Sequence, residues 1–163
     1  EYGNYNSDMT RTVPVNGKFT PRQRAVYESV LNMMTYAKKI LRPGILKSEY
    51  ERLVRVFAAG ELVKLGLITP SQVAEKPSDP PIVRKYYMHG CSHFLGLDVH
   101  DVGEANPVVL PGMVFTVEPG IYIAEEGIGI RLENDVLIGE TENIDLLGDV
   151  PLLPDDIERL MAR

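Results

Sequence analysis

The residues of this chain that could do chemistry include a compact group of imidazoles. Its three histidines, His89, His93 and His100, all lie within twelve residues of one another. Neutral imidazole is the commonest metal ligand in proteins and the usual proton shuttle near neutral pH. Three unrelated core or surface histidines would give the same count, but their clustering among glycines and small residues favours a functional site.

Three carboxylates accompany the histidines. Glu118 ends the apolar run 112–120, Glu133 lies within the apolar, β-rich run 127–138, and Asp8 is a further candidate near the start of the chain. A carboxylate is almost never buried unless it is paired or bound to a metal. One histidine and three carboxylates form a hard, oxygen-rich ligand set, which suits manganese, cobalt or zinc.

Length and composition indicate one globular domain. The chain has 163 residues, of which 44% are hydrophobic and 25% charged, ordinary values for a domain with its own core. The net charge of −6 argues against a nucleic-acid-binding surface. No apolar run is long enough to span a bilayer, so we expect neither a nucleic-acid nor a membrane partner.

The single cysteine, Cys91, excludes an internal disulfide and suggests a reducing compartment. We therefore expect a cytoplasmic protein. A nucleophilic role for Cys91 is disfavoured, since its position between histidines could equally hold any small residue. The chain begins with Glu1 rather than Met and opens in mid-pattern, so we expect it to be a piece of a longer polypeptide.

The first half of the chain should supply an extended segment and two helices. Residues 1–16 are β-like, with Asp8, Thr10 and Thr12 on one face of a strand. Thr20–Pro21 predicts a helix start, and the apolar stripe that follows runs to Ile40.

A second helix should begin at Ser48, with Glu51 completing a capping box. We expect the charged residues of both helices to lie on solvated faces. The buried face of the second helix is predicted to contain Leu53, Val56, Phe57, Val63 and Leu67.

The second half should form a sheet around the candidate ligands. Residues 113–118 are apolar on both faces, which predicts a central strand with Glu118 at its end. Pro119–Gly120 should turn the chain before residues 121–123 continue as a strand, and 125–127 should make a hairpin turn. In the returning strand, 128–138, Arg131 and Glu133 share one side. A terminal helix should begin at Pro154.

These residues resemble a known enzyme family. The chain is similar to the carboxy-terminal part of bacterial-type Xaa-Pro aminopeptidases (aminopeptidase P), which are pita-bread metallopeptidases. The likeness covers essentially the whole chain in order. The matching motifs are SDMTRT at 7–12, HGCSHFLGLDVHD at 89–101, TVEPG at 116–120 and IRLEND at 130–135.

The resemblance implies a fold and a ligand set. The fold would be α+β, an incomplete pita-bread fold whose curved, mainly antiparallel sheet carries helices on one face. Residues 1–163 would be the carboxy-terminal part of the catalytic domain. Two divalent metal ions, usually Mn²⁺, would be held by Asp8, His93, Glu118 and Glu133, with Asp8 and Glu133 bridging the two.

The resemblance also implies a reaction. A metal-activated water would attack the peptide bond and release the amino-terminal residue of a peptide whose second residue is proline. Glu118 would also shuttle the proton, His89 and His100 would line the substrate pocket and stabilise the tetrahedral intermediate, and Arg131 would orient the ligands. We also expect a homo-oligomer.

The chain departs from the family pattern at its start. The family has an amino-terminal domain and a further aspartate ligand on a strand that would precede Glu1, and neither is present in these 163 residues. The remaining residues would complete one metal site and leave the other without its own ligand. We therefore expect the parent protein to be active and this piece alone to be impaired.

Three other functions remain open at this point. A prolidase, which cleaves only Xaa-Pro dipeptides, would use the same ligands. A non-catalytic pita-bread module that binds peptides would be expected to lose ligand residues, and here they are kept. Metal-free, creatinase-like hydrolysis is disfavoured by the same carboxylates.

Overall fold

The structure of the protein, a computed structural model, describes residues 2–162. Glu1, the first residue of the predicted 1–16 strand, and Arg163 lie outside that range. The helices are α1 (Pro21–Ile40), α2 (Lys47–Lys64), α3 (Pro70–Ala74) and α4 (Pro154–Met161), with two 3₁₀ turns, η1 (Pro81–Lys85) and η2 (Ala124–Glu126). The strands are β1 (Val114–Val117), β2 (Gly120–Ile123), β3 (Ile128–Arg131), β4 (Asn134–Leu137) and β5 (Ile144–Asp145).

Helix α1 begins where the sequence predicts. The Thr20 hydroxyl accepts a hydrogen bond from the backbone N–H of Gln23, whose side chain in turn accepts one from the Thr20 N–H. Pro21 occupies the first turn, where a missing N–H costs no hydrogen bond. Helix α4 also begins at its predicted proline, Pro154, and the short helix α3 begins in the same way at Pro70.

The strands form one long antiparallel hairpin that is broken in the middle. β1 pairs with β4, and β5 adds to the outer edge of β4, while β2 pairs with β3. β2 follows β1 after a two-residue break at Glu118–Pro119, and β4 follows β3 after a break at Leu132–Glu133. The two breaks face each other, since the Leu132 N–H donates to the Pro119 carbonyl over 3.3 Å.

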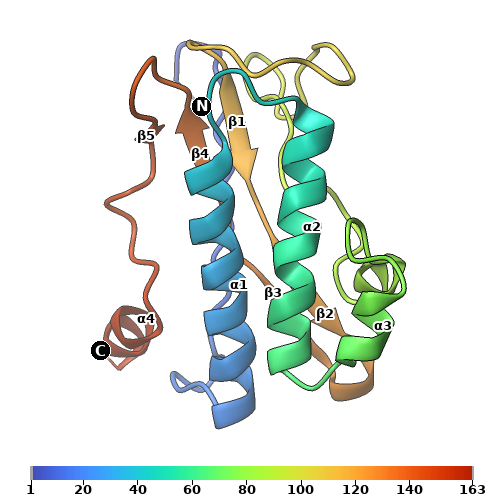
Figure 1. Ribbon diagram of the computed structural model, residues 1–163. Helices are drawn as coiled ribbons and strands as arrows, with labels where there is room; N and C mark the ends of the chain where they lie inside the picture. The colour runs from blue at the N-terminus through green and yellow to red at the C-terminus, as the bar shows by residue number, and fades with distance from the viewer. Residues whose placement is uncertain (1, 163) are drawn as a thin grey trace.

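The two long helices cover one face of this hairpin (Figure 1). α1 packs against α2 and against β1, β2 and β3, and its apolar stripe enters the core as predicted. The α+β architecture, with an antiparallel sheet and helices on one face, is therefore confirmed. The largest fully buried side chains of this core are Tyr27, Met33, Met34, Leu41, Tyr50, Leu62, Tyr87, Phe115, Ile121, Ile123, Leu132 and Ile138.

The predicted strand over residues 1–16 is wrong as a continuous strand. Gly3 and Asn4 have positive φ, and the chain folds back there through reciprocal backbone hydrogen bonds between Tyr2 and Tyr5. Thr10 makes a single β-bridge, to Glu133. At Thr12 the side chain replaces the backbone ladder: its hydroxyl donates to the Arg131 carbonyl and accepts from the Arg131 N–H.

The predicted start and buried face of α2 are also wrong. The helix begins at Lys47 after Leu46, with no side-chain cap among the described residues. Its buried face contains Tyr50, Glu51, Val54, Ala58, Ala59, Glu61 and Leu62, whereas Leu53, Val56, Phe57, Val63 and Leu67 are only half-buried. The observed face is an apolar stripe spaced by four residues, and it also includes two glutamates that have hydrogen-bond partners inside the fold.

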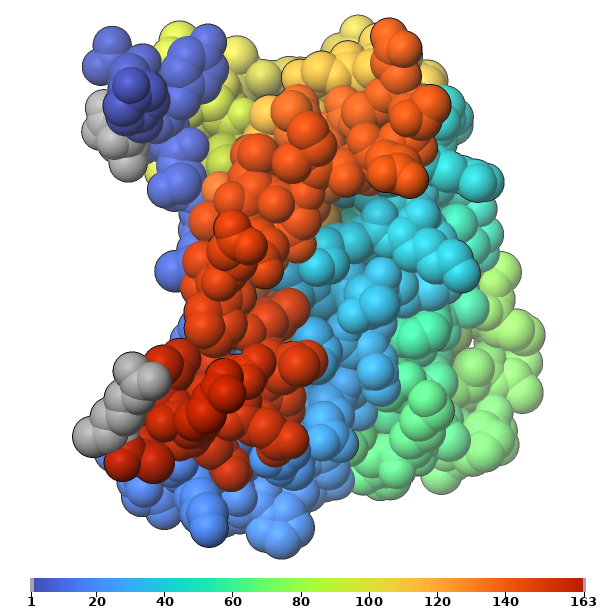
Figure 2. Space-filling view, turned by 90° about the vertical axis from the view of Figure 1, so that its left-hand side faces the viewer, coloured from blue at the N-terminus to red at the C-terminus, as the bar shows by residue number. Residues whose placement is uncertain are grey.

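The surface is hollowed on the side away from the two long helices. Figure 2 shows this concavity between the amino-terminal segment, in blue, and the carboxy-terminal region, in red. None of the helices among residues 2–162 is long and apolar enough to cross a membrane.

Asp145 ties β5 to the rest of the fold and should make stability depend on pH. Its carboxylate pairs with Lys38 of α1 at 2.9 Å and accepts from Asn134 and the Leu147 N–H. Although burial alone would raise the pKa of Asp145, these hydrogen bonds and the Lys38 charge hold it below its usual range. The stabilisation is therefore complete above about pH 4 and is lost as the pH falls through the folded-state pKa.

We predict that Asp145→Asn lowers the free energy of unfolding by roughly 1–2 kcal/mol at pH 7. The difference from wild type should shrink towards zero well below pH 4, where the wild-type carboxyl is itself protonated. Denaturant unfolding across pH 7 to 3 measures this difference. A difference that stays constant over the whole range would contradict the assignment.

Candidate metal centre

The histidine loop lies beside strand β1. The Glu118 N–H donates to the Cys91 carbonyl over 2.8 Å, and the Thr116 N–H donates to the His93 carbonyl over 3.1 Å. The Thr116 hydroxyl also accepts from the His93 N–H. Because side chains alternate along an extended chain, this pairing sets His93 and Glu118 on the same side.

The break in the hairpin brings further acidic groups to the same place. Glu118 follows β1 and Glu133 precedes β4, at the two facing breaks. The amino-terminal segment runs along the second break, where the Glu133 N–H donates to the Thr10 carbonyl and the Asp8 N–H donates to the Asp135 carboxylate. Asp8 is thereby held close to Glu133.

Three predicted ligands converge. Asp8, His93 and Glu133 each offer one ligand atom, and these atoms all lie within 4.8 Å of one another. The His93 Nε2 atom lies 3.6 Å from Asp8 Oδ2 and 3.4 Å from Glu118 Oε1. The fourth predicted ligand, Glu118, thus lies beside the other three.

The orientation of the His93 ring suits metal binding. Its Nδ1 atom lies 2.8 Å from the Phe94 carbonyl oxygen. A carbonyl can only accept a hydrogen bond, so Nδ1 carries the proton. In the neutral ring, Nε2 then presents its lone pair to the carboxylates, which also present lone pairs. A cation between them would turn this repulsion into attraction.

The buried carboxylates leave open positions for a cation. Glu133 is 1% exposed; its Oε2 accepts from the Thr10 hydroxyl at 2.6 Å, while its Oε1 has no hydrogen-bond partner among the described residues. Asp135 Oδ1 is likewise buried and has no hydrogen-bond partner among the described residues. Burial, with the charges of Glu118 and Asp8, raises the pKa of Glu133, and burial raises that of Asp135 to about 6. A bound cation would stabilise the charged form of both carboxylates and would supply the missing partners of their oxygens.

The predicted catalytic residues line one cavity beside this cluster. The cavity has a volume of about 380 Å³ and is lined by His89, His100, Glu118 and Arg131, with His93, Gly90 and Ser92. The His100 ring stacks on that of His93, with centroids 4.0 Å apart. The structure therefore brings together every residue that the sequence assigned to the site.

His89 is engaged by a tyrosine that the sequence did not single out. Its Nδ1 lies 2.7 Å from the Gly90 carbonyl, so Nδ1 carries the proton, and Nε2 then accepts from the Tyr122 hydroxyl at 2.8 Å. The neutral His89 ring consequently has no N–H left for a substrate oxygen. Donation by His89 would require a second proton or a rearranged Tyr122.

Arg131 acts on Glu133 through a hydroxyl. Its Nε donates to the Thr10 hydroxyl at 3.0 Å, and that hydroxyl donates to Glu133 Oε2. The direct separation between Arg131 Nε and Glu133 Oε2 is 3.8 Å. Thr10 and Thr116 are thus site residues that sequence reasoning missed. The signal was present, since Thr116 shares a strand face with Glu118 and Thr10 shares one with Asp8.

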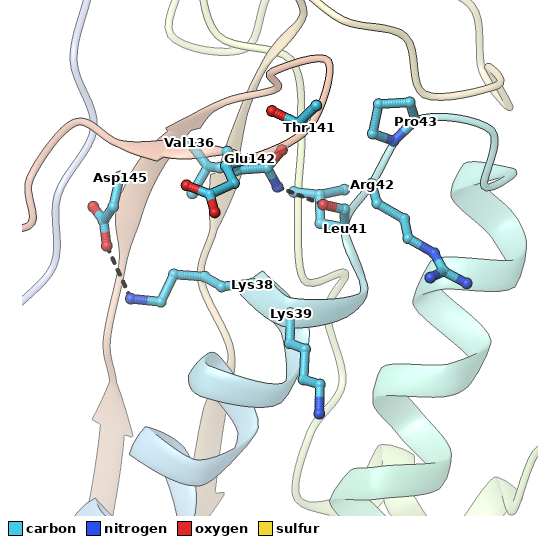
Figure 3. A pocket seen from close by; sticks show the side chains of 10 residues that line it. Lys38, Lys39, Leu41, Arg42, Pro43, Val136, Thr141, Glu142 and Asp145 are labelled. Carbon is cyan, nitrogen blue, oxygen red and sulfur yellow. Dashed lines mark hydrogen bonds and ion pairs between the residues drawn. The ribbon is translucent and has the colours of Figure 1, made fainter.

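A separate hollow lies at the carboxyl end of α1. It has a volume of about 500 Å³ and is shown with Lys38, Arg42, Glu142 and Asp145 around it (Figure 3). No histidine lines it, and Lys38 is already paired with Asp145. It therefore lacks the donor set of the cluster around His93.

Comparisons with known proteins agree with this site. The profile of metallopeptidase family M24 matches residues 1–140. The chain is 44% identical to the Xaa-Pro aminopeptidase of Escherichia coli K12, over 99% of this chain and 39% of that protein. It is 37% identical to rat Xaa-Pro aminopeptidase 3, over 98% of this chain and 33% of that protein.

Solved structures give the same picture. The fold matches Zn-substituted E. coli aminopeptidase P in complex with product, with a TM-score of 0.88 and 42% identity over 99% of this chain and 39% of that chain. It also matches proline aminopeptidase P II from Yersinia pestis, with a TM-score of 0.87 and 44% identity over 98% of this chain. The chain spans about two fifths of the length of these two structures.

Cys91 should be chemically inert in the native protein. It is fully buried, and burial, with the nearby charge of Glu51, raises the pKa of its thiol to about 12. Since the thiolate is the reactive form, we predict no reaction with a thiol reagent at pH 8 until the protein unfolds. Comparing thiol counts under native and denaturing conditions measures this. Rapid native labelling would return Cys91 to the list of candidate nucleophiles.

Proposed function

The chain belongs to metallopeptidase family M24, and from this we propose that its protein is a metal-dependent aminopeptidase that releases the residue before proline at the amino terminus of a peptide. Relatives that are named Xaa-Pro aminopeptidases support this proposal. The observation that carries it is the convergence of Asp8, His93 and Glu133 within 4.8 Å, beside a cavity, lined by His93, that is large enough for a substrate terminus.

The metal would be held by the four predicted ligands. Asp8, His93, Glu118 and Glu133 would hold two divalent ions, with Mn²⁺ as the ion. The open Glu133 Oε1 and the His93 Nε2 lone pair supply donors of the type that such ions accept. A divalent cation supplies Lewis acidity, which makes a peptide carbonyl easier to attack.

The remaining site residues would handle protons and orientation. Glu118, whose Oε1 is 3.4 Å from His93 Nε2, would take a proton from the attacking water and return it to the leaving nitrogen. His100 and His89 would lie against the substrate carbonyl, with Tyr122 setting the His89 ring. Arg131 would hold the Glu133 carboxylate through Thr10.

We further propose that residues 1–163 carry only part of the catalytic machinery. The chain spans 39% of the E. coli relative, and the family pattern contains a further aspartate ligand outside this match. Activity would then require the longer polypeptide. The expected homo-oligomer and cytoplasmic location stay predictions.

Metal binding is the first test of this proposal. We predict saturable Mn²⁺ binding in calorimetry, lost in His93→Ala because the Nε2 donor is removed. At a metal concentration 100 times the Kd, binding should stabilise the folded state by about 2.7 kcal/mol.

The matched control for the metal titration is Glu61→Gln, which alters a buried side chain of helix α2 that contacts Lys64 and Asn32 rather than the site. This variant should bind Mn²⁺ as the wild type does. Absence of Mn²⁺ binding by the wild-type polypeptide at full length would refute the proposed metal centre.

Substrate length separates the proposed aminopeptidase from a prolidase. We predict that the full-length protein cleaves an Xaa-Pro-Yaa tripeptide after its first residue, and that Glu118→Gln slows this by 10²-fold or more, because a ligand and a proton carrier are lost together. Liquid chromatography of the products measures the cleavage.

Cleavage of Xaa-Pro dipeptides alone would instead assign the protein as a prolidase. Metal binding without cleavage of either substrate would favour a peptide-binding module. Vigorous cleavage by the 163-residue chain on its own would contradict the need for further polypeptide.

A further inference from the structure

Helix α2 carries a buried carboxylate that reaches into the histidine loop. Glu51 is 9% exposed although it belongs to a helix whose other side faces solvent. Its Oε2 accepts from the Cys91 N–H at 2.8 Å, and its Oε1 accepts from the Ser92 N–H at 3.2 Å. Lys47, one turn earlier, donates to Oε1 at 3.2 Å.

These two amides belong to the peptide stretch between His89 and His93. Gly90 also packs on the same carboxylate, because a Cβ atom added there would lie 3.4 Å from Glu51 Oε1. Two adjacent N–H groups that point at one carboxylate fix the direction of the backbone between the two histidines. We call this pair of contacts, from the Cys91 and Ser92 N–H groups to Glu51, the fork. It therefore sets the backbone from which the His89 and His93 rings project.

Cys91 connects this fork to the opposite side of the site. Its N–H is held by Glu51, and its carbonyl accepts from the Glu118 N–H at 2.8 Å. The backbone N–H and carbonyl of one residue thus link helix α2 to the carboxylate-bearing end of β1. A shift of the Cys91 backbone would move His93 and Glu118 relative to each other.

We propose that Glu51 is a positioning residue, whose carboxylate sets the backbone of the histidine loop and so the convergence of the ligands in the site. The inference rests on the proposed function for its metal readout, but the backbone contacts stand without it. Glu51 touches neither substrate nor metal in this arrangement. It acts through Cys91 and Ser92.

A carboxylate is required at this position rather than an amide. Both loop groups are donors, and both Glu51 oxygens accept. In Glu51→Gln the side-chain carbonyl can serve one N–H, while the NH₂ group would face the other N–H as donor against donor. One buried amide then loses its partner, and the loop must move to satisfy it.

The same helix offers a matched control. Glu61 is also buried, at 2% exposure, and pairs with Lys64 at 2.6 Å. Its other contact is the Asn32 side chain of α1, not the histidine loop. Glu61→Gln therefore makes the same chemical change on the same helix without touching the site.

The experiment compares Mn²⁺ affinity by calorimetry in wild type, Glu51→Gln and Glu61→Gln. We expect about 10-fold or greater weakening in Glu51→Gln, the scale found when partners that orient metal ligands are removed, and unchanged affinity in Glu61→Gln. Equal affinity in all three proteins, or equal weakening in both variants, would overturn the proposal.

A second measurement uses the wild-type protein without metal, so it does not depend on the folding of any variant. Amide hydrogen exchange in the metal-free wild-type protein should show the Cys91 and Ser92 N–H groups protected as strongly as core strand amides. Rapid exchange at both would overturn the fork. If the wild type binds no metal while both amides are protected, the proposed metal centre fails and the positioning of the loop by Glu51 stands.

Discussion

The candidate site is defined by carboxylates that converge at one point of a hairpin, and the rest of the structure has to accommodate their repulsion. Glu133 is buried with one oxygen that has no hydrogen-bond partner within residues 2–162, and Asp8 and Glu118 add negative charge around it. Like charges gathered away from water disfavour the folded state unless a proton or cation joins them. The hydroxyl of Thr10 and the more distant Arg131 relieve only part of this repulsion. The remaining deficit of positive charge is the physical reason to read the cluster as a cation site.

The backbone places these charges by interrupting its own sheet. Pro119 has no N–H to give to a ladder, so the pairing of β1 and β4 stops there and resumes between β2 and β3. Glu118 and Glu133 occupy the two sides of this interruption. In a continuous hairpin, the regular alternation of side chains between the two faces of the sheet would fix the directions of both residues. The two long helices cover one face of this broken sheet (Figure 1).

Much of this arrangement could be predicted from the sequence, and the exceptions share one cause. The proline-marked helix starts, the strand end at Glu118 and the gathering of the three histidines were predicted correctly, since local chemistry or a specific motif determines them. The amino-terminal segment was misjudged because Thr12 replaces backbone pairing with its side chain. Helix α2 was misjudged because Glu51 is satisfied by loop amides distant in sequence. Tertiary partners decided both cases, and a single sequence does not display them.

Two buried glutamates show that hydrogen-bond partners, rather than burial, distinguish a structural carboxylate from a candidate metal ligand. Glu51 is surrounded by donors: two backbone amides and Lys47 engage its oxygens. Glu133 is more deeply buried, yet one of its oxygens has no hydrogen-bond partner within residues 2–162. A fully paired carboxylate holds a fold in place, whereas one buried with an open oxygen keeps a position for something that the chain itself does not provide. The two glutamates are linked through the histidine loop, so the satisfied one builds the frame in which the unsatisfied one can bind.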